Sequence, residues 1–281
     1  MRAFNGDIED IIRKRKSCRS YSDRKIGNDI MAEVITMLRD VESIATSAFQ
    51  LKYIGGSGTK GNERVGTYGM ISGATDYIAV IARREGNDPV EIGRLFETAV
   101  LQLADLGLDT CWLGGSFNRK DFEGRLDLGS SEYIPIVSPV GYGKERFSIL
   151  DSSVRVMVGA DTRKPWNEMF FNENTLNPLE KDKAGAFRIP LEMVRLGPSA
   201  SNKQPWRVIT DKKGCHFYLS RDKGYGLKTY DLQLNDIGIA MCHFELTASQ
   251  WGMDGSWKGE AHPAAPSEWE YVRSYIVQAN V

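Results

Sequence analysis

Positive charge gathers near the start of the chain, where it could bind an anion. The run RKRKSCRSYSDRK, residues 13–25, carries seven Lys or Arg against one Asp. Ser17 stands among Arg15, Lys16 and Arg19, so cations and a hydroxyl donor converge as a phosphomonoester requires. Two other interpretations stay open. One is a solvated basic face at a helix C-terminus. The other is a nucleic-acid patch, although no aromatic-rich RNA-binding motif accompanies the run.

A second segment combines small and amide side chains. GPSASNKQPWRV, residues 197–208, reads as a turn between a helix and a strand, stiffened by Pro198 and Pro205. Asn202 and Gln204 can each donate and accept hydrogen bonds, which suits a ring with mixed polar edges. The plainer alternative is a polar turn followed by a core Trp206.

Four segments together resemble the signatures of the FMN-dependent nitroreductases. RKSCRSY is similar to their N-terminal R-R-S-x-R-x-F/Y, and PSASNKQPWRV to their P-S-x-x-N-x-Q-P-W. LGLDTCWLGG resembles the flavin-side helix end and loop, and RKPWNEMF, residues 163–170, the terminal segment of the family. The resemblance covers nearly the whole chain. Two departures are Lys16 in place of the usual Arg and Cys18 in place of an aliphatic residue. Lys16 keeps the charge but loses bidentate geometry.

The two main signatures are divided between the halves of the chain. The first half has RKSCRSY, but its counterpart of the second signature reads ATSAFQLKYI. The second half has N-x-Q-P-W but no R-x-S-x-R. An ordinary family member carries both in one subunit and forms two flavin sites across a homodimer. The division resembles the fused branch of the fold, and it implies an intramolecular pseudo-dimer with one complete and one degenerate site.

The resemblance implies a set of FMN-binding residues from both halves, and no catalytic acid, base or metal ligand. From the first half come the clamp residues and a glycine loop beside the flavin ring. From the second half comes the small-residue loop, and Arg163 and Lys164 are weaker phosphate candidates. The full set is Arg15, Lys16, Ser17, Arg19, Leu113, Gly114, Gly115, Arg163, Lys164, Pro198, Ser199, Ala200, Asn202 and Gln204.

The implied activity is hydride transfer from NAD(P)H as co-substrate, through FMN, to an electron-poor acceptor such as a nitroaromatic or a quinone. In such enzymes the flavin carries the chemistry, and the protein supplies binding and orientation. Two rivals remain: a non-catalytic flavin- or nucleotide-binding protein, and an anion-binding module that uses only the basic cluster. The expected partner is a small molecule, not nucleic acid or membrane. A monomeric pseudo-dimer is expected, with a homodimer as the alternative.

An internal repeat supports two fused halves. Residues 92–115 align without gaps with residues 237–260, an offset of 145. Five identities relate the segments: Ile92 with Ile237, Gly93 with Gly238, Gly107 with Gly252, Trp112 with Trp257 and Gly114 with Gly259. Each segment predicts an apolar-striped helix, a Gly stop and a short strand bearing the Trp. Leu95 and Ala99 are replaced by Ala240 and Phe244, and Leu106 by Trp251, an exchange of sizes that favours two facing helices.

The remaining elements follow hydrophobic periodicity. We expect a helix at Ile8–Ile12 with Asp7 as N-cap, and helices near residues 29–40 and 191–196. Strands are expected near residues 51–54, 76–82, 134–140, 206–210, 216–220 and 271–277. This order predicts an α+β fold, a nitroreductase-like FMN-binding α/β sandwich of two tandem pseudo-symmetric halves. The boundaries we expect are 1–147, a connecting segment 148–180, and 181–281.

Composition and minor motifs exclude other classes. The 281 residues have a formal charge of −1, which argues against bulk binding of polyanions. No run reaches the roughly 18–20 apolar residues of a membrane span. The first residues lack an apolar h-region, so we expect no signal peptide, and four scattered cysteines favour a cytoplasmic protein. GSGTKG, residues 56–61, matches G-x-G-x-x-G but lacks the βαβ context, so we expect a loop. The three histidines lack metal-site spacing.

Overall fold

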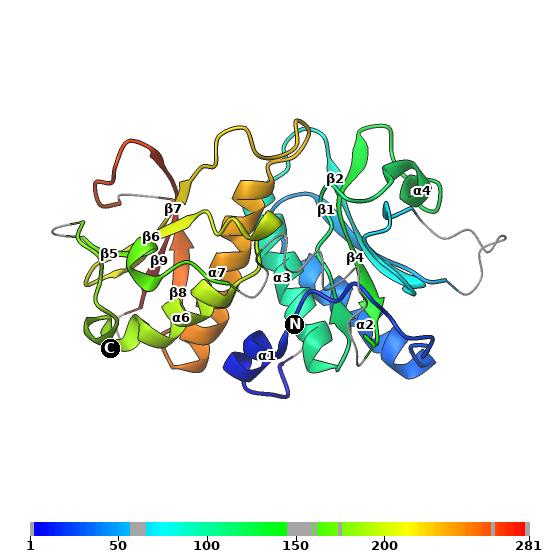
Figure 1. The fold of residues 1–281 in the computed structure, drawn as a ribbon, viewed down its shortest axis with the longest axis horizontal. Helices are drawn as coiled ribbons and strands as arrows, with labels where there is room; N and C mark the ends of the chain where they lie inside the picture. The colour runs from blue at the N-terminus through cyan, green and yellow to red at the C-terminus, as the bar shows by residue number, and fades with distance from the viewer. Residues whose placement is uncertain are drawn as a thin grey trace.

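The computed structural model describes residues 3–56, 66–144, 159, 162–173, 176–259 and 262–278. Most of the GSGTKG run and part of the 148–180 connection lie outside this range. Within it, the two predicted halves each contain a sheet and a long buried helix. Figure 1 shows the sheets at opposite ends of the longest axis, with α3 and α7 side by side between them.

The first half contains a four-stranded antiparallel sheet of order β1-β2-β4-β3. Asp7 caps the first helix as predicted, because its carboxylate accepts the backbone N–H groups of Glu9 and Asp10. Asp88 caps α3 in the same way, and Pro89 occupies its first turn. The elements are α1 (Ile8–Lys14), α2 (Asn28–Ser43), β1 (Phe49–Ile54), β2 (Asp76–Arg83), α3 (Pro89–Asp105), β3 (Asp109–Thr110), α4 (Arg119–Glu123) and β4 (Glu132–Gly141).

The second half contains a five-stranded sheet of order β5-β6-β7-β9-β8. Asp231 caps α7 through the N–H groups of Gln233 and Leu234. The elements are η1 (Trp166–Glu168), β5 (Phe170–Asn172), η2 (Lys181–Lys183), η3 (Gly185–Phe187), α6 (Arg188–Leu196), η4 (Ala200–Asn202), β6 (Trp206–Thr210), β7 (Gly214–Ser220), α7 (Leu232–Gln250), β8 (Gly255–Lys258) and β9 (Trp269–Val277).

The strand order of the first sheet recurs in the second. Strands β6-β7-β9-β8 follow the order of β1-β2-β4-β3, and α7 stands after β7 as α3 stands after β2. The extra strand β5 comes from the connection between the halves and pairs in parallel with β6, from Phe170 beside Val208 to Asn172 beside Thr210. The sequence did not predict β5. The connection therefore completes the edge of the second sheet.

The two long helices cross at a pair of glycines that are equivalent in the repeat. A Cβ on Gly93 would collide with the carbonyl oxygen of Asn235, and a Cβ on Gly238 with that of Val90. Because Asn235 and Val90 are also 145 positions apart, the crossing has approximate two-fold symmetry. Only glycine permits this backbone approach. The prediction that these helices face each other is confirmed.

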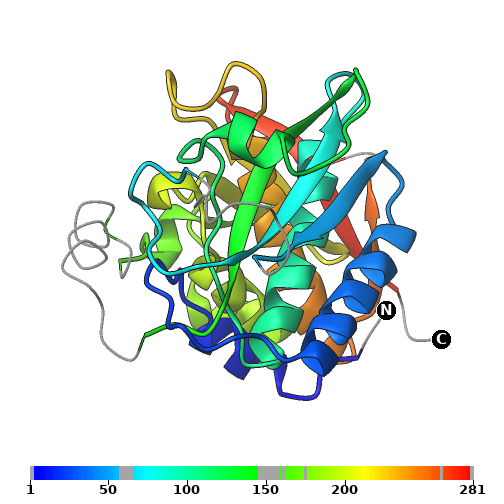
Figure 2. The same cartoon turned by 90° about the vertical axis from the view of Figure 1, so that its right-hand side faces the viewer.

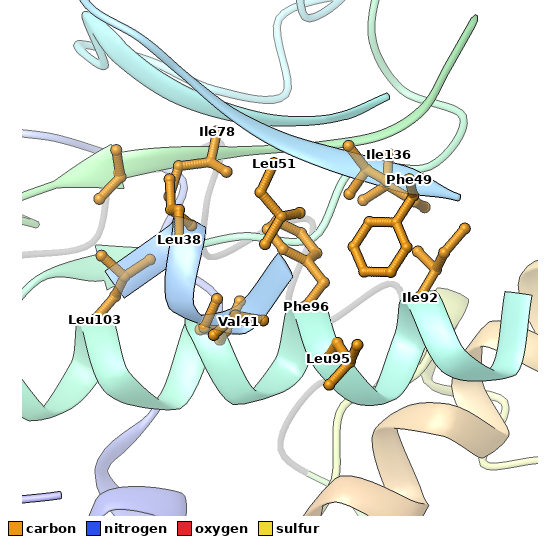
Figure 3. Packing of buried hydrophobic residues seen from close by; sticks show 14 of the residues in the cluster. Leu38, Val41, Phe49, Leu51, Ile78, Ile92, Leu95, Phe96, Leu103 and Ile136 are labelled. Carbon is orange, nitrogen blue, oxygen red and sulfur yellow. The ribbon is translucent and has the colours of Figure 1, made fainter. Parts of the chain in front are cut away.

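The apolar core of the first half lies between its sheet and the α2–α3 pair. Figure 2 shows α2 and α3 running alongside the strands, and Figure 3 shows Leu38 and Val41 of α2 meeting Leu51 of β1 and Phe96 of α3. The second half has its own cluster, in which α7 packs beneath β6, β7 and β9 around the fully buried Trp206. Burial of both helix faces explains their long apolar runs.

Two details of the repeat were predicted wrongly. Strand β3 ends at Thr110, so Trp112 lies in the following loop and not in a strand, whereas Trp257 lies in β8 as expected. Trp251 is 56% exposed and its indole N–H donates to Glu9, so it takes no part in the helix contact. A helix end can present a large side chain to solvent without breaking the apolar stripe behind it. In the described ranges, no helix is both long and apolar enough to cross a bilayer.

Candidate functional site

The predicted glycine loop and small-residue loop line one hollow of about 430 Å³, which we call the loop pocket. This volume lies within the usual range for small-molecule sites. Gly114 and Gly115 come from the first half, and Pro198, Ser199 and Ala200 come from the second half. The remaining lining residues are Trp112, Ser116, Ile136, Ser201, Gly224, Tyr225, Gly226, Leu227, Leu232, Asn235, Asp236 and Ile239.

The loop after Ser199 holds a strained backbone. Ser201, Asn202 and Gln204 have positive φ values of 47°, 55° and 48°. Such conformations are uncommon outside glycine and persist where surrounding contacts enforce them. Here the Ser199 hydroxyl accepts the N–H of Gln204 at 2.9 Å, and the Tyr225 hydroxyl donates to Ser201 at 2.9 Å. The loop is thus fixed in shape before any ligand arrives.

A buried carboxyl group supports this loop from α7. Both carboxyl oxygens of Asp236 accept the backbone N–H of Ala200, at 2.9 and 3.1 Å. Asp236 is 2% exposed, and burial raises its pKa well above the usual value despite that hydrogen bond. The carboxyl group therefore favours its protonated form more than an ordinary Asp does.

Arg15 and Lys16 lie at a second hollow of about 310 Å³, which we call the clamp pocket. It is formed by α1, the residues after it and the segment from Ala104 to Thr110. Four carboxylates also line it, so the charge is mixed. Three of them are committed elsewhere: Asp7 caps α1, Asp105 accepts the N–H groups of Asn5 and Gly6, and Asp109 that of Gly143.

The Arg15 side chain is buried behind the clamp pocket and is only 6% exposed. Its Nε lies 3.9 Å from Oε1 of Glu97, and no hydrogen-bond acceptor for it occurs among the described residues. The segment 109–115 links the two hollows, because Asp109 and Thr110 line the clamp pocket and Trp112 lines the loop pocket. Thr110 of the clamp pocket and Trp112 of the loop pocket are thus two positions apart in the chain.

A third group of predicted residues is joined by hydrogen bonds. Gln204 accepts the backbone N–H of Lys164 at 2.8 Å, and Asn202 accepts from Arg163 at 3.5 Å and donates to Gly159 at 2.6 Å. Burial, together with the nearby Arg207 guanidinium, lowers the pKa of Lys164. The Asn and Gln side chains thus anchor the 159–164 segment to the loop, and they do not line the loop pocket.

Three predicted residues are placed by backbone contacts. Ser17 forms a parallel bridge to Thr110, which aligns the clamp signature with the 109–115 segment. Arg19 gives its carbonyl oxygen to the N–H of Ser72. Leu113 pairs with Val137 and buries its side chain in an apolar cluster, away from both hollows. Across the described ranges, no three His, Cys, Asp or Glu side chains gather as a metal site would require.

The residues that close the loop pocket were not predicted from the sequence. Gly224–Leu227 precede α7 and form one wall, and Asp236 forms part of the floor. The glycine-rich run DKGYG, residues 222–226, is the sequence signal that could have indicated the Gly224–Leu227 wall. Asp236 stands where the first half has Glu91, which the repeat alignment could have shown. Both carboxyl groups support a loop, as described below.

The fold and the two-half site define a nitroreductase-type α+β protein, and comparison with known proteins agrees. A family model described as "Putative TM nitroreductase" matches residues 7–248. The chain belongs to this nitroreductase family.

A crystal structure of a "putative nitroreductase" from Thermotoga maritima is 18% identical and covers 99% of this chain and 95% of its own, with a TM-score of 0.56. An FMN-dependent nitroreductase from Clostridium difficile R20291 is also 18% identical. It covers 49% of this chain and 88% of its own, at a TM-score of 0.37. No curated protein matches.

Proposed function

We propose that this protein is an FMN-dependent oxidoreductase that takes hydride from NAD(P)H and reduces an electron-poor small molecule. The observation that carries the proposal is the loop pocket, where Gly114 and Gly115 of one half face Pro198–Ala200 of the other. Membership of the nitroreductase family supports the reaction class. The cofactor assignment depends on the residues of this chain.

Two observations test whether the residues fit a flavin. A Cβ on Gly114 would lie 2.5 Å from Leu232, so glycine keeps this wall open and its backbone accessible. Arg15 keeps a buried guanidinium N–H without a hydrogen-bond acceptor in the described ranges. The loop pocket combines apolar, hydroxyl and amide groups that suit a flavin ring, and Arg15 and Lys16 of the clamp pocket supply cations for its phosphate. We conclude that the residues fit the group.

Each part of the site has a role in this proposal. Arg15 and Lys16 hold the phosphate through charge-assisted hydrogen bonds. The rigid loop 199–204 and the Gly114–Gly115 backbone orient the ring and keep water from one side of it. Bound FMN would supply two-electron redox chemistry between the nicotinamide and the acceptor. No side chain is assigned as a catalytic acid or base.

Both contributing halves belong to one chain, which supports a site that does not need a second subunit. Covalent linkage makes the pairing of the halves intramolecular, with an effective concentration of order millimolar. We therefore propose a flavin-loaded monomer of 31.5 kDa. The degenerate side of the repeat lacks the clamp signature, so the proposal assigns one FMN to each chain.

Calorimetric titration of the apoprotein with FMN tests the cofactor and its stoichiometry. One FMN per chain is expected, with occupancy that does not change on dilution to nanomolar protein. NAD(P)H oxidation is then followed with and without a quinone or nitroaromatic acceptor. Two equivalent flavins per chain, or occupancy that follows a dimer, would contradict the one-chain site. Tight FMN binding without NAD(P)H oxidation would instead favour a non-catalytic flavin-binding protein.

A further inference from the structure

A buried carboxylate connects the two hollows of the site. Glu97 of α3 is fully buried, at 0% exposure. Its Oε2 accepts the indole N–H of Trp112 at 2.7 Å, and its Oε1 lies 2.9 Å from Nε2 of His243 on α7. Oε1 is also 3.9 Å from Nε of Arg15. One side chain thus contacts a wall of the loop pocket, the opposite long helix and the predicted clamp.

The hydrogen-bond pattern around His243 is fixed by its surroundings. Nδ1 lies 2.9 Å from the carbonyl oxygen of Met193, which can only accept, so Nδ1 carries a proton. One further proton must then lie between Nε2 of His243 and Oε1 of Glu97. Both carboxyl oxygens of Glu97 are therefore committed, and the Trp112 indole has a partner that cannot rotate away. The Trp112 ring also meets Phe96 edge to face, with 4.7 Å between centroids.

The equivalent positions on the other side of the repeat lack this arrangement. Glu97 and His243 correspond to Cys242 and Thr98, whose side chains meet at 3.3 Å. Trp257, the counterpart of Trp112, has a buried indole N–H without a hydrogen-bond acceptor among the described residues. The helix crossing itself therefore does not need a charged pair. The pair occurs only on the side that carries the clamp and the loop pocket.

We infer that Glu97, held by His243, is a positioning residue that fixes Trp112 as a wall of the flavin-binding loop pocket. The inference rests on the proposed function for the identity of the ligand. It predicts that the ring end of the cofactor, and not only its phosphate, depends on a carboxylate that lines neither hollow. The contacts of Glu97 with Trp112, His243 and Arg15 compensate for burying a carboxylate, which would be costly without partners.

Two substitutions separate positioning from simple packing. In Glu97→Gln, the amide oxygen can still accept from Trp112 and the NH₂ can donate to Nε2 of neutral His243, so the indole stays in place. In Glu97→Ala both contacts disappear. Cys242→Ala is the matched control, because it removes the equivalent contact to Thr98 across the pseudo-two-fold axis. Far-UV circular dichroism is recorded to check that each variant is folded.

Affinities for FMN and for riboflavin are the first readout. Glu97→Ala should weaken both about tenfold, the value of one hydrogen bond to a charged group. Glu97→Gln and Cys242→Ala should stay within about twofold of wild type. In a Trp112→Phe background, which has no indole N–H, Glu97→Ala should add less than about twofold. Equal losses from the Gln and Ala variants, an equal loss in the control, or additive losses in the Phe background would overturn the inference.

A second readout needs no flavin. Acrylamide quenching of Trp112 fluorescence in the apoprotein, obtained by difference against Trp112→Phe, should rise in Glu97→Ala and stay unchanged in Glu97→Gln. Unchanged quenching in Glu97→Ala would overturn the inference whatever the ligand. Wild-type protein that binds neither flavin would contradict the proposed function, while quenching would still decide whether Glu97 holds Trp112.

Discussion

The two sides of the repeat share their scaffold but differ in polar chemistry. On the side of the loop pocket, Asp236 supports the loop at Ala200 through one N–H. On the other side, Glu91 supports the loop at Thr46 and Ser47 through two backbone N–H groups and a hydroxyl. The glycines of the helix crossing are alike on both sides. The two halves therefore share a backbone framework and differ in the polar groups around it.

This difference is also visible in the ionisation of the two carboxyl groups. Burial opposes ionisation of Glu91, but its hydrogen bonds from Ser47 and Thr46 together lower its pKa. Burial of Asp236 is not offset in this way, and its pKa is raised. One side of the repeat thus has a satisfied structural carboxylate. The other has a buried carboxyl group that accepts a single backbone N–H and lines the loop pocket.

The largest effect is expected at the shared framework. Gly93→Ala and Gly238→Ala each force a Cβ against a backbone carbonyl of the opposite helix, so the helices must separate. Each substitution should cost about 3 kcal/mol, because overpacking a tight contact is not relieved by side-chain rotation. Urea denaturation measures the loss, with Gly27→Ala in open space as control. A loss confined to one of the two glycines would refute their structural equivalence.

A smaller, pH-dependent effect should distinguish the two carboxyl groups. In Glu91→Gln, an amide NH₂ replaces a carboxylate oxygen that accepts a hydrogen bond from the Thr46–Ser47 loop, so two donors meet. The free energy of unfolding should therefore fall by about 2 kcal/mol at pH 7. The pKa of Glu91 is lowered from 4.5, so its contribution exists above that value and is lost as the pH falls below it. The difference in free energy of unfolding between wild type and Glu91→Gln, measured by urea denaturation, should therefore become smaller as the pH falls below 4.5.

Asp236→Asn should act in the opposite direction at neutral pH. The pKa of Asp236 is raised above 3.8, so its stabilising contribution is complete below that value and declines as the pH rises through the folded-state pKa. The Asn oxygen can still accept from Ala200. The variant should thus melt above wild type at pH 8, with no gain near pH 4. Melting temperatures of both variants are measured between pH 4 and pH 8. If Asp236→Asn and Glu91→Gln both lowered, or both raised, the melting temperature at pH 8, the proposed difference between the loops would be contradicted.

Much of this architecture could be predicted from the sequence because it follows periodic burial. The strand expected near residues 206–210 matches β6, the apolar stripe beginning at Ile92 predicted most of α3, and the repeat predicted that α3 faces α7. Strand β5 was missed because three residues, Phe170–Asn172, are too short to show a period. Glu97 was missed because an acidic residue within a helix usually faces solvent, and only the fold shows its partners.

The site was predictable to a lesser extent, because loops are positioned by distant residues. Of the site residues predicted from the signatures, five line the loop pocket and two line the clamp pocket. The signatures do not show that Asn202 and Gln204 anchor the 159–164 segment. That role depends on a non-local hydrogen-bond pattern. The wall at Gly224–Leu227 belongs to no signature, and its place over the pocket follows from the packing of α7.

A modest effect is expected where the two halves differ in the space around a glycine. Gly114 and Gly259 are equivalent in the repeat, but a Cβ on Gly259 would meet no atom within 4 Å, whereas one on Gly114 would displace Leu232. Leu232 can move, so Gly114→Ala should fold normally and narrow the loop pocket. We expect FMN affinity to fall about tenfold, or about 1.4 kcal/mol, with no change in Gly259→Ala. Equal FMN affinities of the two variants would place the ring elsewhere.

The smallest effect is expected at Trp257, whose buried indole N–H has no hydrogen-bond acceptor among the described residues. Trp257→Phe removes an indole N–H that has no acceptor in the described part of the chain, so the relief of an unsatisfied donor offsets part of the lost packing against Phe217 and Tyr275. The net change in stability should stay within about 1 kcal/mol, less than a typical loss of several kcal/mol for truncating a buried aromatic ring. Trp112→Phe, by contrast, leaves Glu97 short of a donor and should cost more. Urea denaturation of the two variants compares the sides directly. If Trp257→Phe lost more stability than Trp112→Phe, the hydrogen bond from Trp112 to Glu97 would contribute nothing to stability. The two tryptophans would then differ only in how they pack.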